Sequence, residues 1–153
     1  MAEALPNDFL EPEAHIVARL QQALAGLQPA VHVLTAAQLA GVKESAQHTP
    51  AVHVVWSGFR VLESRSDGRA ARLDHTWLVV AAVRNVQGTR SGAAARAEAG
   101  ELSARVGAAL MGFRAPNTAG PLRLTSAPPA GYSAGFMYLP LAFLVETAFK
   151  AAA

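Results

Sequence analysis

The chain of 153 residues contains no cysteine, which excludes disulfides, thiolate metal ligands and thiol nucleophiles. Residues 1–13, MAEALPNDFLEPE, carry acids and no base, so the basic start of a secretory signal is missing. The longest apolar runs, WLVVAAV and FMYLPLAFLV, are shorter than the about 20 residues that a membrane-spanning helix needs. We therefore expect a soluble protein, made in a cytoplasm and without a membrane partner.

Charge is also scarce, at 16% of residues with a net value of +2. No basic cluster with interleaved aromatic residues occurs, so the pattern of a nucleic-acid-binding protein is absent, and we expect no direct nucleic-acid partner. A hydrophobic content of 52% is typical of a folded globular protein. With no repeat and no Gly/Ser linker, we expect one domain over residues 1–153, with a flexible tail at 1–10 and a folded part at 11–150.

The apolar patterns predict an α+β fold. Long helices are expected at 11–27 and 91–112, a short helix at 36–41, and strands at 30–34, 51–58, 74–85, 121–128 and 135–149. Residues 59–73 are expected to be half strand and half polar loop, with a turn at Asp67-Gly68. Because the strands follow one another in pairs, we expect a mainly antiparallel sheet of four to five strands, with the two long helices packed on one face.

Residues 131–135, GYSAG, match the Gly-x-Ser-x-Gly string of a serine-hydrolase nucleophile elbow. A working elbow lies between a strand and a helix, and its histidine follows the serine in the chain. Here two prolines precede the string, a strand-like run follows it, and the last histidine, His75, lies far upstream. We expect Gly131 and Gly135 to permit a bend into the last strand, and a hydrolase that uses Ser133 is a minor alternative.

Three histidines, His32, His53 and His75, each fall inside or at the start of a predicted strand. Three imidazoles on neighbouring strands could bind zinc and leave a position open for water. However, the sequence has no His-x-His pair, and no acid is spaced to orient a ring. We expect separate strand histidines, with no metal and no other cofactor, and we keep a metalloenzyme as a second minor alternative.

Four arginines gather around the polar stretch at 59–73: Arg60, Arg65, Arg69 and Arg72. A solvated loop, neutralised in part by Glu63 and Asp67, is the simpler interpretation. The functional alternative is a loop that faces an acidic partner surface. Because the stretch has little apolar surface to offset ordering entropy, we expect it to be mobile in the free subunit and ordered on assembly.

The strands at 74–85 and 135–149 are apolar on both faces, and two helices are enough to cover only one face. Pro140 cannot donate to a strand ladder, so it indicates an edge or a bulge. An exposed apolar edge favours self-association, although the short helix, the tail and loops could cover the second face instead. The candidate subunit interface comprises Met137, Leu139, Pro140, Leu141 and Phe143.

Four segments, PAVHVVWSGFRV, TWLVVAAVRN, AGELSARVGAALMGF and LRLTSAPPAGYSAGFMYLPLAFLVET, resemble in this order the Mu-like phage tail terminator family. The likeness covers most of the chain, including HIVARLQQAL near its start. It implies a structural α+β subunit, without enzymatic activity or cofactor, that forms a ring of usually six copies.

Such a ring caps the head-proximal end of the tail tube, ends tube polymerisation and offers a surface for joining head to tail. The implied partners are further copies of the chain, the tail tube protein and head-completion or connector proteins. The implied location is the neck-proximal end of the virion tail, after synthesis in the host bacterial cytoplasm. Another head–tail completion or minor tail protein is the main alternative, and a monomeric ligand-binding domain is a further one.

Overall fold

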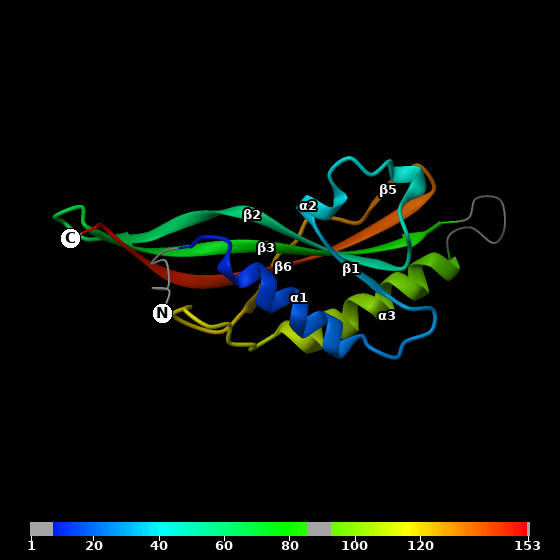
Figure 1. The fold of residues 1–153 in the computed structure, drawn as a ribbon, viewed down its shortest axis with the longest axis horizontal. Helices are drawn as coiled ribbons and strands as arrows, with labels where there is room; N and C mark the ends of the chain where they lie inside the picture. Colours follow the sequence, from blue (N-terminus) through cyan, green and yellow to red (C-terminus); the bar gives the residue numbers. More distant parts are fainter. Residues whose placement is uncertain (1–7, 86–92, 153) are drawn as a thin grey trace.

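The computed structural model describes residues 8–85 and 93–152. Its helices are α1 (Glu11–Ala23), α2 (Ala36–Leu39) and α3 (Ala93–Leu110), with a short 3₁₀ helix, η1 (Glu44–Ala46). Its strands are β1 (His32–Thr35), β2 (Ala51–Ser64), β3 (Ala70–Arg84), β4 (Arg123–Thr125), β5 (Gly131–Ser133) and β6 (Phe136–Lys150). The predicted α+β class is confirmed (Figure 1).

The strands form one six-stranded sheet in the order β1-β2-β3-β6-β4, with β5 also paired to β6. Only β1 and β2 run parallel, so the sheet is mainly antiparallel, as predicted. The strand number exceeds the expected four to five because β5, of three residues, forms an additional strand that pairs with β6.

Local signals in the sequence account for the two N-terminal helices. In α1, Pro12 occupies the first turn, where its missing N–H costs no helical bond, and Glu11 and Glu13 favour the positive end of the dipole. The helix ends at Ala23, one turn before the predicted Leu27. In α2, the capping box is confirmed, since the Gln38 N–H donates to Thr35 Oγ1 at 3.4 Å and the Thr35 N–H to Gln38 Oε1 at 2.9 Å.

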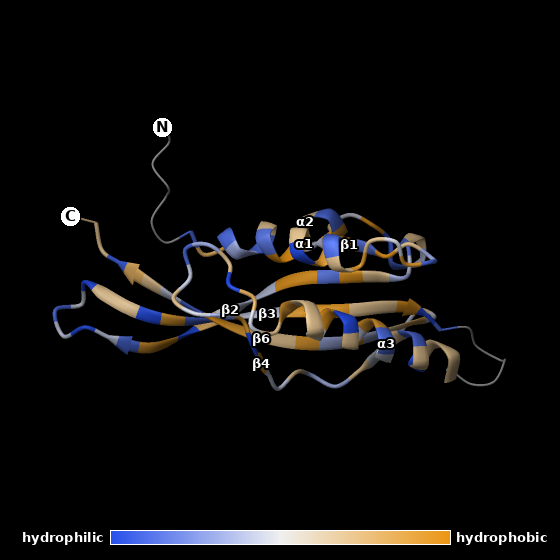
Figure 2. Cartoon of the chain, turned by 90° about the horizontal axis from the view of Figure 1, so that it is seen from below, coloured by the Kyte–Doolittle hydropathy of each residue, from blue (hydrophilic) through white to orange (hydrophobic). Residues whose placement is uncertain are grey.

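Both long helices lie on one face of the sheet, which we call the helix-covered face (Figure 2). Helix α1 contacts β1 and β2, α3 contacts β3 and β6, and the two helices contact each other. Their apolar stripes meet inward-facing strand residues in one core: Leu20, Val54, Trp77, Val79, Val106 and Phe143. The opposite side is called the second face. The predicted helix at 91–112 is confirmed for Ala93–Leu110, while 91–92 lie outside the described residues.

Strand β6 is more central than Pro140 suggested. It pairs with β3 along its whole length, and its other side pairs with β5 at 136–138 and with β4 at 142–144. The expectation of an edge strand is therefore wrong for most of β6. Pro140 falls in the interval between β5 and β4, opposite Val80 of β3, where the outer ladder is interrupted and the missing N–H removes no bond to β4 or β5.

Three strands run on beyond the helices and form a projection that we call the arm, residues 59–75 and 145–150 (Figure 1). The predicted turn is confirmed, with Gly68 at φ +74° and its N–H bonded to the carbonyl of Arg65 at 2.8 Å. The expected polar loop at 59–73 is otherwise wrong, because β2 and β3 stay paired from Phe59–His75 out to Ser64–Ala71.

A bulge at Gly58, φ +97°, marks the base of the arm. Before it, Val54 and Trp56 of β2 face the helices; after it, Phe59 and Val61 point to that same side, opposite His75 and Leu73. The bulge adds one extra residue to β2 and so shifts the alternation of the strand by one position. Because of this shift, strict alternation along the sequence does not identify the continuous apolar face.

Candidate assembly surfaces

The GYSAG string is a tight β-hairpin. Strand β5 ends at Ser133, which pairs with Phe136, and the two residues between them, Ala134 and Gly135, have φ values of +51° and +83°. Positive φ at both central positions is the requirement of the type I′ turns that join twisted antiparallel strands. The bend into the last strand is thus confirmed, and the serine lies in a strand-to-strand turn rather than in a strand-to-helix elbow.

Polar contacts fasten this hairpin to the segment before β2. The Ser133 hydroxyl donates to Glu44 Oε1 at 2.8 Å, and the Tyr138 hydroxyl donates to Glu44 Oε2 at 3.0 Å. Gln47 Nε2 donates in turn to the Tyr138 oxygen at 2.7 Å. Burial, more than the contact with Glu44, raises the pKa of Tyr138. One end of the second face is therefore covered by the chain itself.

The three strand histidines lie in separate surroundings. His32 is 5.4 Å from the ring of His48, and buried His53 is 6.3 Å from the ring of Tyr138. His75 lies at the base of the arm. Across residues 8–85 and 93–152, no three His, Asp or Glu side chains form a group that could hold a metal ion. The structure thus does not bring His32, His53 and His75 into one site.

The candidate residues of the last strand divide between the two faces. Phe143 and Met137 are buried under the helices, and Leu139 and Leu141 are half-buried against the same core. Pro140 alternates to the second face, where it is half-buried. Other half-buried apolar residues share that face: Val55, Leu78, Val80 and Leu144. Phe143 and Met137 therefore have little surface to offer a partner, and a contact through this strand would use the second face around Pro140.

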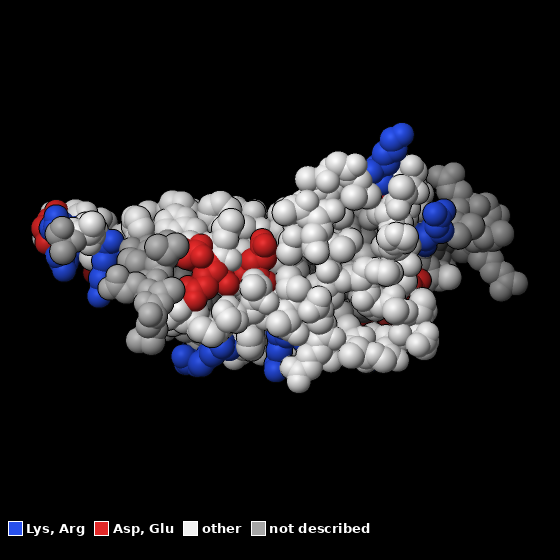
Figure 3. Space-filling model, in the orientation of Figure 1, with Lys and Arg blue, Asp and Glu red and all other residues white. Residues whose placement is uncertain are grey.

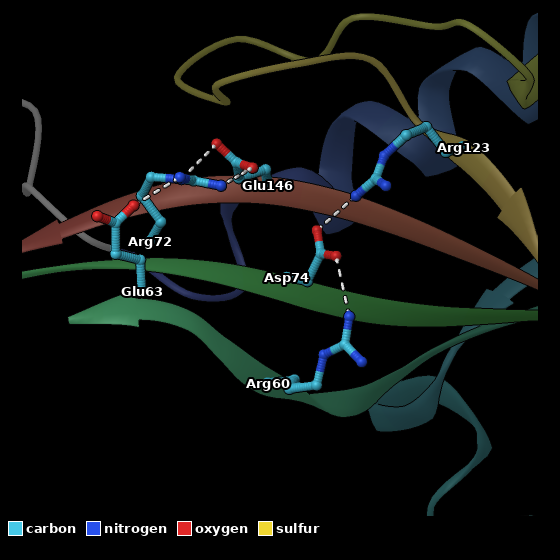
Figure 4. Close-up of polar contacts among 6 residues, drawn as sticks. All are labelled: Arg60, Glu63, Arg72, Asp74, Arg123 and Glu146. Atoms are coloured by element: carbon cyan, nitrogen blue, oxygen red, sulfur yellow. Dashed lines mark hydrogen bonds and ion pairs between the residues drawn. The ribbon is translucent and has the colours of Figure 1, made fainter.

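One side of the arm, continuous with the second face, carries an ion-pair network (Figure 4). Buried Asp74 accepts a hydrogen bond from Arg123, and Arg60 lies 4.0 Å from its other oxygen. Nearer the tip, Arg72 lies 2.8 Å from Glu63 and 3.4 Å from Glu146. This side is thus polar and largely neutralised within the subunit.

All four predicted arginines lie on the arm, as the sequence placed them around one stretch. Arg65 donates to both oxygens of Asp67, at 2.9 and 2.7 Å, and this hydrogen bond is the main cause of the lowered pKa of Asp67. Arg69 donates to the Ala152 carbonyl at 2.7 Å. Arg60 has the loosest contact and is 76% exposed. Their role as a partner-facing group stays a prediction.

The other side of the arm is apolar, and sequence reasoning missed it. Phe59, Val61 and Phe149 are 48%, 52% and 42% exposed there. Phe9 covers the base of this side, with its ring centroid 5.3 Å from that of Phe59 and 5.2 Å from that of Phe149. The alternation of Phe59 and Val61 was the available signal, and the polar residues between them concealed it. Residues 8–10, expected in a flexible tail, are held by this contact, whereas 1–7 lie outside the described residues.

His75 ties the three arm strands together at their base. Its Nδ1 accepts a hydrogen bond from Trp56 Nε1–H at 3.1 Å, so Nε2 carries the proton and donates to Thr147 Oγ1, 2.9 Å away. Burial lowers the pKa of His75, and the negative charge of Asp74 opposes this shift. The ring is thus held neutral, in one tautomer, beneath Phe9.

Comparison with known proteins gives one clear relationship. A family model described as phage tail terminator protein matches residues 6–152, which is nearly the whole chain. The comparison with curated proteins gave no match. Within the described residues, no helix is long and apolar enough to cross a membrane. The match is to the family as a whole, which is structural and non-enzymatic and is located in the virion tail, and the Mu-like subgroup stays a prediction. The chain belongs to the phage tail terminator family.

Proposed function

We propose that copies of this chain form a ring of six that caps the head-proximal end of a phage tail tube and ends tube polymerisation. The observation that carries this proposal is the extent of the family match, residues 6–152. Since the match includes both long helices and the whole sheet, the proposed role belongs to the complete fold rather than to one motif.

The subunit surface is suited to such an assembly. A closed ring requires heterologous contacts, in which one patch of each subunit meets a different patch of the next. The arm and the half-covered second face are two separate surfaces with exposed or half-buried apolar residues. These surfaces could meet different neighbours, whereas a monomer in water would gain nothing from leaving them uncovered.

The proposed partners are those of a tail-end ring. One rim of the ring would contact the last ring of tail tube protein, and the other would contact head-completion or connector proteins. The hydrolase alternative gains no support from the geometry around Ser133, which lies in a hairpin turn and donates to Glu44. The metalloenzyme alternative gains none either, because the three histidines lie apart.

Tube assembly in the presence and absence of this chain tests the proposal. The tube protein is best taken from the gene neighbourhood of this chain, and tube lengths are measured by electron microscopy. We expect the chain to bind as a ring at one tube end and to stop further growth from it. Tubes that keep growing, with no ring at either end at any concentration of the chain, would contradict the proposal.

A further inference from the structure

The apolar side of the arm is only partly covered by the described part of its own subunit, because Phe59, Val61 and Phe149 stay about half exposed beside Phe9. Phe59 and Val61 of β2 and Phe149 of β6 share one face of the arm, with β3 between the two strands, and this face is the one that the helices cover in the rest of the sheet. The helices end before they reach the arm (Figure 1), so Phe9 is the ring that packs there. Half-exposed aromatic and β-branched residues that lie together on a sheet are typical of a surface that binds another protein.

Charge indicates what that partner is. The arm tip, residues 65–70, carries two basic residues, Arg65 and Arg69, and one acidic residue, Asp67, a net charge of +1. The α1 start, residues 8–13, carries Asp8, Glu11 and Glu13, a net charge of −3. Glu11 accepts a hydrogen bond from Asn117 at 2.6 Å, and within the described residues no ion pair neutralises the three carboxylates. Figure 3 shows acidic side chains gathered at the α1 start, away from the charged arm tip.

The α1 start also carries apolar surface. Leu10 is 48% exposed between the acidic residues, and it directly follows the Phe9 ring that covers the base of the arm. An exposed leucine with an acidic border complements an exposed apolar strip with a basic tip. Within one subunit, Phe9 is the residue of the α1 start for which ring contacts with the arm are found, at the arm base. A contact that also buries Leu10 and joins the acidic and basic groups would come from another copy, and such a contact is heterologous.

We propose that the arm docks on a second copy of this chain, with its apolar side against the neighbour's Leu10 and its basic tip against the neighbour's acidic α1 start. This contact rests on the proposed function, since it supplies the repeated head-to-tail joint of the ring. Each docked arm would then reach as far as the neighbour's Phe9, which packs on the base of the neighbour's own arm. The ion-paired side of each arm stays in contact with water.

Substitution at one exposed site on the arm and at a matched site on the body tests the contact. Val61→Asp places a charge on the apolar side of the arm, and Met111→Asp places one on a residue of similar exposure, 57%, just after α3. Self-association is measured by light scattering over a range of concentrations, and ring binding is measured at tube ends. We expect Val61→Asp to weaken association by at least about tenfold and Met111→Asp to leave it within about twofold.

Mixing two defective variants tests the head-to-tail geometry. Val61→Asp has a damaged arm and an intact α1 start, and Leu10→Asp has the reverse. Each variant alone should stay monomeric where the wild type assembles, and their mixture should form pairs that do not grow further. Full rings from the mixture, or no pairs at all, would overturn the contact.

A charge exchange checks the acidic and basic halves of the contact. Arg69→Glu and Glu13→Arg should each weaken association, and the chain with both changes should recover most of it.

Rings from Val61→Asp as stable as the wild type, or equal losses in Val61→Asp and Met111→Asp, would overturn the arm contact but not the proposed ring. A wild-type chain that neither associates nor binds tube ends would overturn the proposed function and the contact together.

Discussion

The body of the sheet and the arm share three strands, β2, β3 and β6, yet they differ in how their apolar side is covered. In the body, α1 and α3 cover that side, and Trp77 and Phe143 have no exposed surface. In the arm, Phe9 is the ring among the described residues that packs on the base, and Phe149 stays 42% exposed. Strand patterning is therefore not what separates the buried core from the exposed arm in this fold, because the difference lies in whether helices cover the strands.

The largest effect on the free energy of unfolding should come from comparing a Phe→Ala substitution in the body with one in the arm. Phe143→Ala empties a fully buried position and should lower the free energy of unfolding by about 3–5 kcal/mol. Phe149→Ala, on the arm, should lower it by less than about 1 kcal/mol, since its ring already contacts water. Urea unfolding measures both values, and equal losses would show that the arm is as much a part of the core as the body.

The second effect concerns the boundary between the regions. Asp74 is a buried carboxylate between Arg60 and Arg123, from strands on either side of it. Asp74→Ala removes the shared acceptor and should cost about 2–3 kcal/mol in the free energy of unfolding. Glu101→Ala, which removes an exposed pair with Arg105 on α3, is the matched control and should cost less than about 0.5 kcal/mol. A loss below 1 kcal/mol for Asp74→Ala would show that water replaces the carboxylate.

A substitution of Phe9 tests how much one aromatic ring stabilises the arm, which α1 and α3 do not cover. Phe9→Ala uncovers Phe59 and His75 and should lower the free energy of unfolding by about 1–2 kcal/mol. It should also speed amide exchange in the arm while leaving α3 unchanged. If exchange speeds up equally in both, Phe9 would be a determinant of the whole domain and not of the arm.

The smallest effect is a dependence on pH. His75 has a folded pKa below its ordinary value of 6.5 because it is buried, so the unfolded chain binds its proton more readily. The contribution of His75 is therefore complete above about pH 6.5, and it is lost as the pH falls from there toward the folded pKa, by at most about 1.4 kcal/mol per pH unit. Buried His53 shifts in the same direction.

Unfolding measured from pH 8 to pH 5 checks this dependence. His75→Gln should flatten part of the decline, whereas His48→Gln, a change at an exposed residue, should retain it. An unchanged slope in His75→Gln would mean that other groups cause the acid sensitivity.

Features with local causes were predictable from the sequence. The capping box at Thr35 and Gln38 starts α2 where expected, and the acidic first turn with Pro12 starts α1. The turn at Asp67-Gly68 and the bend at Gly135 follow from residues that favour positive φ. The residues around GYSAG do not fit a nucleophile elbow, and the structure has a hairpin at this string.

Features that depend on distant partners were not predictable. The polar residues from Arg60 to Arg72 look like a loop, yet both ends of this stretch lie in strands, where Arg72 meets Glu63 and Glu146 on the two neighbouring strands. Pro140 suggested an edge, but the interval between β5 and β4 places it inside the sheet. Phe9 belonged to an expected tail because nothing nearby in the sequence identifies the aromatic residues on which it packs.

Amide exchange of the free and assembled chain tests the central claim, that the arm is the joint between copies, most directly. The outer edge of β2 from Phe59 to Ser64 and the α1 start should exchange quickly in the free subunit, because no described strand covers that edge and the first helical N–H groups have no helical partner. Both segments should slow by at least about tenfold in the ring, while α3 changes little. Equal protection of the arm in free and assembled chains would contradict it.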